Sequence, residues 1–131
     1  MEPVVWKHKP EAHDYTAAGS YLSLVASADL VTDLVDRLQA ADIGYFKAKD
    51  LLRAATLRLL PTDNPHVATD LAKIKDGREL SPILLVRGDL TTGVPLHIAD
   101  GYHRVCASYH VDENTEIPAR IVDWRQGTLP S

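Results

Sequence analysis

The stretch PILLVRG at residues 82–88 is the feature that most constrains the fold. Its apolar run is continuous, without the alternation expected of a strand that has one face in water. Such a run is typical of a strand that is buried on both faces. This strand therefore predicts a sheet with helices packed on it, and a fold of the α/β class.

Hydrophobic periodicity predicts the other elements. Helices are expected at about 28–41, 47–55, 67–75 and 102–110, and further strands at 57–61, 96–99 and 117–124. Residues 1–19 are polar and are expected to be irregular. Leu30, Leu34 and Leu38 form an apolar stripe on the first helix. We expect this stripe to pack on the open face of the sheet; the alternative is a homodimer or partner interface.

The length of 131 residues fits one domain, with an N-terminal helical extension at 1–56 and a core at 57–123. No apolar run approaches the roughly 20 residues of a membrane span, and the N-terminus has no apolar stretch like that of a signal peptide. A cytoplasmic protein without a membrane partner is the resulting expectation. The single cysteine, Cys106, excludes an internal disulfide and is expected to be buried.

The charge balance bears on the kind of partner. The chain has 14 Lys+Arg and 18 Asp+Glu, a formal net charge of −4. Strong sequence-independent binding of DNA needs clustered positive charge, and the chain has no basic run beyond KAKDLLR at residues 47–53. The composition therefore disfavours DNA as a partner and favours a small anionic ligand.

The strongest candidate for a ligand-binding site is the sequence ADGYHR at residues 99–104, where the predicted strand ends and the next helix begins. A helix start offers unpaired N–H groups and a partial positive charge, to which His103 and Arg104 add side-chain donors. Gly101 would let a ligand approach the backbone. These features predict a phosphate or carboxylate site. The alternative is structural, with Asp100 as a helix cap and Arg104 paired to a carboxylate.

Four segments occur in a characteristic order: LLPTDNPH, GRELSPILLV, LHIADGYHRVCAS and IPARIV. In this order they resemble the ParB/sulfiredoxin-like superfamily, and the D-G-x-H-R form resembles ParB-like regulators linked to DNA phosphorothioation. The resemblance covers about half of the chain. It implies a small mixed sheet with packed helices, and a nucleotide or phosphate site at the strand-to-helix turn.

The resemblance also implies roles for particular residues. His103 and Arg104 match a phosphate-binding His-Arg pair, within a turn that Asp100, Gly101 and Tyr102 complete. The opposite wall of the site would come from the segment after LLP. The residues expected there are Asn64, His66 and Thr69, with Lys73 as a further candidate. Asp63 lies near the position of a catalytic glutamate in free-serine kinases, although PTDNP is also an ordinary turn sequence.

Two activities of the superfamily are not expected. Tyr102 stands where sulfiredoxins have their catalytic cysteine, and Cys106 lies one helical turn further on. ParB proteins have a glutamate and two arginines where this chain has Tyr102, His103 and Arg104, which argues against CTP hydrolysis of the ParB kind.

The sequence thus predicts a domain that binds a nucleotide or another phosphorylated small molecule. As an enzyme it would catalyse phosphoryl transfer or nucleotide hydrolysis, with ATP or another nucleotide bound together with Mg²⁺. The catalytic residues would be His103 and Asp63, with Asp63 as the base. The alternative is a non-catalytic regulatory module that binds DNA or a protein. A third interpretation is purely architectural, with Asp100 and Arg104 paired to protein groups and no cleft between them. No metal site is expected, and His8 and His13 are interpreted as exposed residues without metal-binding partners.

Overall fold

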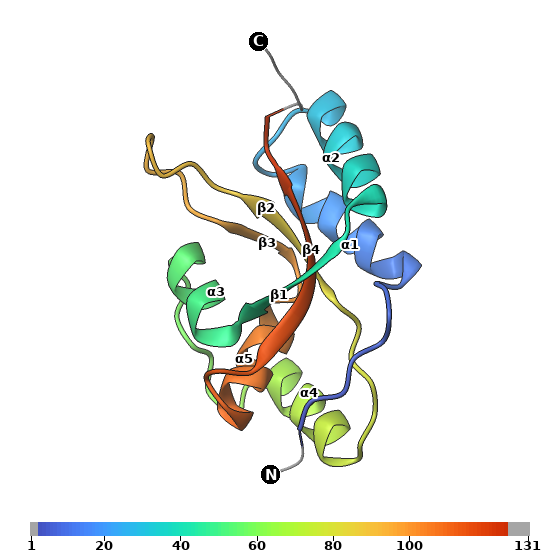
Figure 1. The fold of residues 1–131 in the computed structure, drawn as a ribbon, viewed down its shortest axis with the longest axis vertical. Coiled ribbons are helices and arrows are strands. Elements are labelled where there is room, and N and C mark those ends of the chain that lie inside the picture. The colour runs from blue at the N-terminus through green and yellow to red at the C-terminus, as the bar shows by residue number, and fades with distance from the viewer. Residues whose placement is uncertain (1–2, 126–131) are drawn as a thin grey trace.

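The computed structural model describes residues 3–125, which form five helices and four strands (Figure 1). The helices are α1 (Ala12–Leu22), α2 (Ala28–Ala40), α3 (Ala48–Ala55), α4 (Pro65–Lys75) and α5 (Tyr102–Val111). The strands are β1 (Ile43–Lys47), β2 (Ile83–Arg87), β3 (His97–Asp100) and β4 (Glu116–Asp123).

One mixed sheet runs through the molecule in the order β1-β4-β2-β3. Strand β4 is antiparallel to β1 and parallel to β2, and β3 is antiparallel to β2. The predicted class, a small α/β fold with a mixed sheet and packed helices, is confirmed.

Both faces of this sheet are covered, which the apolar run in β2 predicted. Leu84 and Val86 pack with residues of α1 and α2 on one face. Ile83 and Leu85 pack with residues of α3, α4 and α5 on the other. All four side chains are almost completely buried. Figure 1 shows α1 and α2 on one side of the sheet, with α3 and α5 on the other.

The stripe on α2 is part of this core. Leu34 and Leu38 are buried in the cluster that contains Leu84 and Val86, and Leu30 is partly buried beside them. The expectation that this stripe packs on the open face of the sheet is confirmed, whereas α3, which belongs to the same N-terminal segment, packs on the other face. The stripe therefore packs on the sheet of its own chain. Cys106 is also buried, as expected.

Two local expectations were wrong, and one strand was missed. Residues 12–22 form α1 instead of irregular structure, and residues 43–47 form the edge strand β1, which was not predicted. Residues 57–61 are not a strand. Side chains of α5 bind this segment instead, since the Tyr102 hydroxyl donates to Arg58 O (2.6 Å) and His110 Nε2 lies 2.7 Å from Leu60 O. Residues 57–61 are thus a connecting segment that two side chains of α5 hold by its backbone oxygens.

Candidate functional site

The turn between β3 and α5 is shaped by close packing against β2. Gly101 has a φ of 118°, in the left-handed region that favours glycine. A Cβ added at this position would lie 2.3 Å from Ile83 Cγ2. The glycine is therefore required by the contact with Ile83 as well as by the backbone conformation. No side chain in residues 3–125 caps the start of α5, so Asp100 does not serve as the helix cap.

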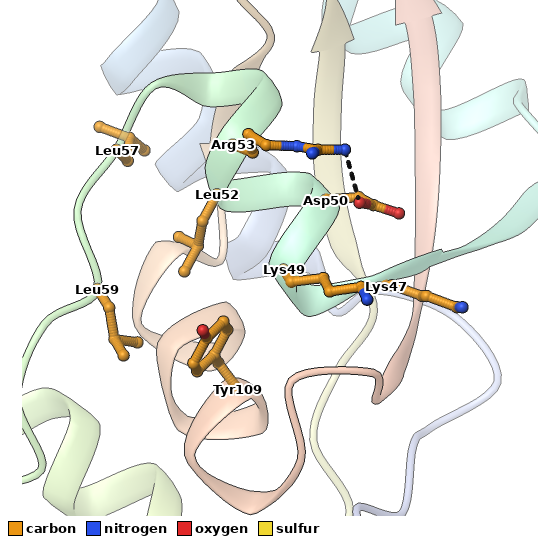
Figure 2. Close-up of a pocket in the computed structure, with 8 residues that line it drawn as sticks. All are labelled: Lys47, Lys49, Asp50, Leu52, Arg53, Leu57, Leu59 and Tyr109. Atoms are coloured by element: carbon orange, nitrogen blue, oxygen red, sulfur yellow. Dashed lines mark hydrogen bonds and ion pairs between the residues drawn. The ribbon is translucent and has the colours of Figure 1, made fainter.

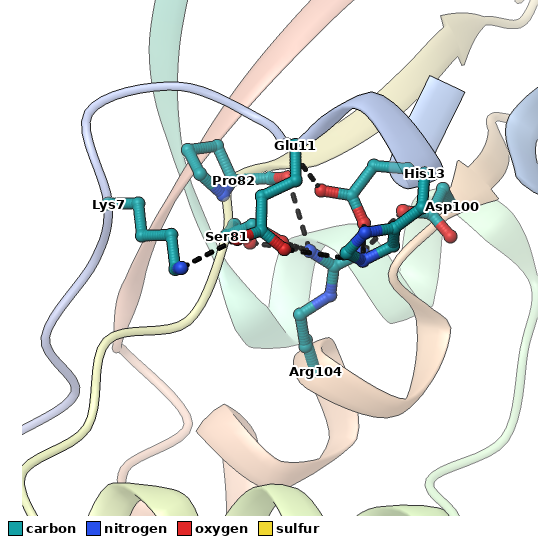
Figure 3. A network of polar contacts seen from close by, with 8 residues as sticks. Lys7, Glu11, His13, Ser81, Pro82, Asp100 and Arg104 are labelled. Atoms are coloured by element: carbon teal, nitrogen blue, oxygen red, sulfur yellow. Dashed lines mark hydrogen bonds and ion pairs between the residues drawn. The ribbon is translucent and has the colours of Figure 1, made fainter. Parts of the chain in front are cut away.

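Arg104 is surrounded by acceptors from three other parts of the fold. Its guanidinium donates to Ser81 O (2.6 Å), Ser81 Oγ (2.5 Å) and Asp100 Oδ2 (2.5 Å), and Asp14 Oδ1 lies 3.6 Å away. The Arg104 side chain is 12% exposed. Figure 3 shows it pointing from α5 towards Ser81 and Asp100. Because these contacts use its donors, Arg104 holds the turn together and presents little free hydrogen-bonding capacity to a ligand.

The two carboxyls beside Arg104 titrate differently. Burial raises the pKa of Asp100 to about 6, and the nearby Asp14 adds to this effect while Arg104 opposes it. Burial also acts to raise the pKa of Asp14, but the Glu11 backbone N–H and the Arg104 guanidinium outweigh it and hold this pKa below its usual range. Asp14 is therefore the carboxylate that keeps its charge as the pH falls, and Asp100 is protonated first.

This raised pKa gives a pH-dependent prediction for Asp100→Asn. The folded state binds the Asp100 proton more tightly than the unfolded chain does, so the contribution of Asp100 to stability falls as the pH rises from about 4 to about 6. The free energy of unfolding of the wild type, minus that of the variant, should fall over this window and level off above it. Urea unfolding at a series of pH values measures this difference. A difference that rises with pH would mean that pairing with Arg104 outweighs the burial of Asp100.

A cleft of about 550 Å³ opens beside this turn. Six of the predicted site residues line it: His66, Thr69, Asp100, Gly101, His103 and Arg104. Lys73, the further candidate, lines it as well. The segment after LLP and the α5 turn therefore line one cleft. The architectural interpretation is right about the pairing of Asp100 with Arg104 and wrong about the absence of a cleft.

The other three predicted residues lie elsewhere. Asp63 is exposed and does not line the cleft. Asn64 caps α4, because its side chain accepts hydrogen bonds from the N–H groups of His66 (3.0 Å) and Val67 (3.2 Å). Tyr102 directs its hydroxyl to Arg58 O, away from the cleft. None of the three presents its side chain to a ligand in the cleft.

Asp70 is a cleft residue that the sequence reasoning missed. It lies one turn after His66 on α4, and burial raises the pKa of its carboxyl. The predicted helix of residues 67–75 left His66 outside; because α4 begins at Pro65, residues 66 and 70 share one of its faces. Asp70 thus lines the cleft, whereas the predicted base Asp63 does not.

The imidazole rings of His66 and His103, which both line this cleft, lie 4.6 Å apart between their centroids. Burial lowers the pKa of His103, and the neighbouring His66 lowers it further. His103 is therefore neutral at pH 7 and offers one donor and one acceptor. A bound anion would favour the protonated ring and reverse this shift.

No protein-family model matches this chain, and no curated protein or solved structure is similar to it at a significant level. The resemblance to the ParB/sulfiredoxin-like superfamily therefore stays a prediction. Within residues 3–125, none of the helices has the length and apolar character needed to cross a bilayer.

A second cavity, of about 630 Å³, is lined by residues of α3, of the segment that follows it, of the end of β1 and of α5 (Figure 2). Its charged residues are three cations, Lys47, Lys49 and Arg53, and one carboxylate, Asp50, which pairs with Arg53 (3.3 Å). Leu52, Leu57, Leu59 and Tyr109 supply an apolar part. None of the predicted phosphate-site residues lines it. The basic run noted in the sequence thus forms a separate positively charged surface.

Proposed function

We propose that the cleft at the start of α5 binds a nucleotide or another phosphorylated small molecule. The observation that carries the proposal is the uncapped first turn of α5, which opens on a cleft lined by His66 and His103. The first backbone hydrogen bond of this helix runs from Val105 N–H to Gly101 O (3.0 Å). The N–H groups of residues 102–104 precede it, and such groups bind phosphate oxygens together with the helix dipole.

Side chains from α4 and from the segment after it line the same cleft and suit the same ligand. Lys73 lines the cleft from α4, and Arg78 lines it just after the end of that helix. Thr69 lines it as well, with its hydroxyl donating to Pro65 O (2.9 Å). The lysine supplies a charged donor, and the His66–His103 pair supplies ring nitrogens. A phosphate bound in the cleft would thus meet the backbone N–H groups of α5 together with cationic and neutral side-chain donors.

Asp70 gives the cleft a group suited to acid–base chemistry. A half-buried carboxyl with a raised pKa can accept a proton from a ligand hydroxyl near neutral pH. Phosphoryl transfer is the reaction class that such a base, with donors for a phosphate, would serve. Mg²⁺ would enter with the phosphates of a nucleotide, as it does in many phosphotransferases. In this proposal Asp70, rather than Asp63, takes the role of base.

The α3 cavity favours a second candidate function. Its three cations, of which Arg53 is paired with Asp50, lie beside an apolar part, and this combination suits an acidic protein segment or a nucleic acid backbone. In that case the chain would be a regulatory module without catalysis. A mobility shift with duplex DNA at low salt, lost at high salt, would support the DNA form of this candidate.

A thermal-shift screen of the full chain against ATP, ADP, CTP and GTP, with and without Mg²⁺, tests the phosphate-site proposal. A ligand at about 100 times its Kd should stabilise the folded protein by roughly 2.7 kcal/mol. The stabilisation should shrink in Lys73→Ala and in His103→Gln, because each variant removes a polar group of the cleft.

Lys75→Ala is the matched control, since Lys75 lies on the same helix, is exposed and does not line the cleft. Its thermal shift should equal that of the wild type. Equal losses in Lys73→Ala and Lys75→Ala would reject the site. The absence of a shift with every nucleotide in a folded protein would favour the regulatory module.

A further inference from the structure

We infer that Glu11, His13 and Asp14 form a binding site for a divalent transition-metal ion at the start of α1. One ligand atom from each of these residues lies within 4.8 Å of the other two. The three residues line the same cleft as His103, but the inference does not depend on a phosphorylated ligand. Glu11 and His13 stand together in Figure 3.

The separations of the ligand atoms fit a metal ion. His13 Nε2 lies 3.3 Å from Glu11 Oε2 and 3.5 Å from Asp14 Oδ1. Metal–ligand bonds of about 2.0–2.2 Å place neighbouring ligand atoms about 2.9–3.5 Å apart in tetrahedral or octahedral sites. The two distances from His13 fall within this range, and the ligand oxygens of Glu11 and Asp14 lie within 4.8 Å of each other.

Both carboxylates are already oriented by their other oxygen atom. Glu11 Oε1 accepts a hydrogen bond from Lys7 Nζ (2.6 Å), which leaves Oε2 towards His13. Asp14 Oδ2 accepts from the Glu11 backbone N–H (2.8 Å), which leaves Oδ1 towards His13. Hydrogen bonds of this kind to ligating carboxylates are the usual outer support of metal sites.

Burial differs across the three ligands in a way that allows an ion to enter. Asp14 is 4% exposed and fixed in the fold, whereas the His13 side chain is 75% exposed. Lys7 and the Arg104 guanidinium, 3.6 Å from Asp14 Oδ1, offset part of the negative charge of the carboxylates. Because these two cations weaken the attraction of the carboxylates for a metal ion, binding also depends on a coordinate bond from the His13 imidazole.

The ligand set selects the class of ion. One imidazole and two carboxylates suit Zn²⁺ or Mn²⁺ better than Mg²⁺, which prefers oxygen ligands alone. Three protein ligands also leave at least one coordination position for water or a ligand oxygen, as in metal sites that act on a bound molecule. The alternative explanation of the geometry is a protonated His13 paired with two carboxylates, which binds no metal.

Isothermal titration of the full-length protein with ZnCl₂ alone, in a non-chelating buffer, decides between these explanations. One Zn²⁺ should bind per chain, Mn²⁺ should bind more weakly and Mg²⁺ weakest. His13→Ala should weaken Zn²⁺ binding by about 100-fold or more, since loss of even an outer-shell partner costs about 10–100-fold. Glu11→Gln should weaken it as well.

His8→Ala is the matched control, because His8 is an exposed histidine of the same segment outside the cluster. Its Zn²⁺ affinity should equal that of the wild type, and a thermal melt should show that His13→Ala remains folded. Equal affinity in the wild type and His13→Ala, equal losses in both histidine variants, or no binding at millimolar Zn²⁺ would each overturn the inference. Nucleotide binding in the same variants is a separate readout, so failure of the metal site and of the phosphate site are distinguishable.

Discussion

Replacing Arg104 by alanine should lower the free energy of unfolding by about 3–5 kcal/mol, because the change leaves buried partners without their cation. Asp14 is 5% exposed at its side chain and Asp100 is 17% exposed. Ser81 would lose the donor to its carbonyl and its hydroxyl. Denaturant unfolding measures the loss, and the melting temperature should fall by about 10–20 °C.

Arg53→Ala is the control for the removal of an arginine as such. Its side chain is 85% exposed and pairs with Asp50 on the surface of α3. Surface ion pairs contribute little, so the stability of this variant should be close to that of the wild type. An Arg104→Ala protein as stable as Arg53→Ala would show that the contacts of Arg104 do not stabilise the turn.

Gly101→Ala should be the other severely destabilising substitution, with a loss of about 2–6 kcal/mol. A backbone at φ 118° is strained for alanine, at about 1–3 kcal/mol. The added Cβ would also meet Ile83 Cγ2 at 2.3 Å and Ile83 Cβ at 2.7 Å, and overpacking of this kind costs about 1–3 kcal/mol. Because Ile83 belongs to the central strand β2, the clash cannot be relieved by moving a surface side chain.

Gly77→Ala separates the two causes. Gly77 has a φ of 71° and no atom within 4 Å of an added Cβ. This variant should lose only the backbone term, about 1–2 kcal/mol. Equal losses at Gly77 and Gly101, measured by urea unfolding, would show that contact with Ile83 does not constrain the turn.

Strong local patterns predicted most of the layered fold. The apolar run of β2 indicated burial on both faces, and the spacing of Leu34 and Leu38 identified the side of α2 that packs on the sheet. Helix α1 was missed because its capping pair is formed by Glu11 and Asp14 in a polar segment, without the serine or threonine that usually marks a helix start. Strand β1 has only five residues, includes Gly44 and leaves Tyr45 65% exposed, so its pattern is weak.

Part of the candidate site was predictable: the residues of the α5 turn from the local sequence, and the residues of α4 from a resemblance. His66 and Thr69 were placed opposite His103 on the basis of a resemblance, and they do line one cleft with it. The partners of Arg104 were not predictable, since Asp14 and Ser81 lie 90 and 23 residues away. Long-range ion pairs leave no local pattern. Nor could His13 be connected to Glu11 and Asp14 while their segment was expected to be irregular.

The contacts of Arg104 make the cleft depend on elements from both faces of the sheet. This side chain joins α5 to the start of α1, and these two helices cover opposite faces of the sheet. Local fraying of α1 would remove Asp14 from the guanidinium and at the same time dismantle one wall of the cleft. Ligand affinity and the amide hydrogen-exchange protection of α1 are therefore thermodynamically linked: any ligand that binds only the assembled cleft must slow exchange in a helix at the opposite end of the sequence from α5.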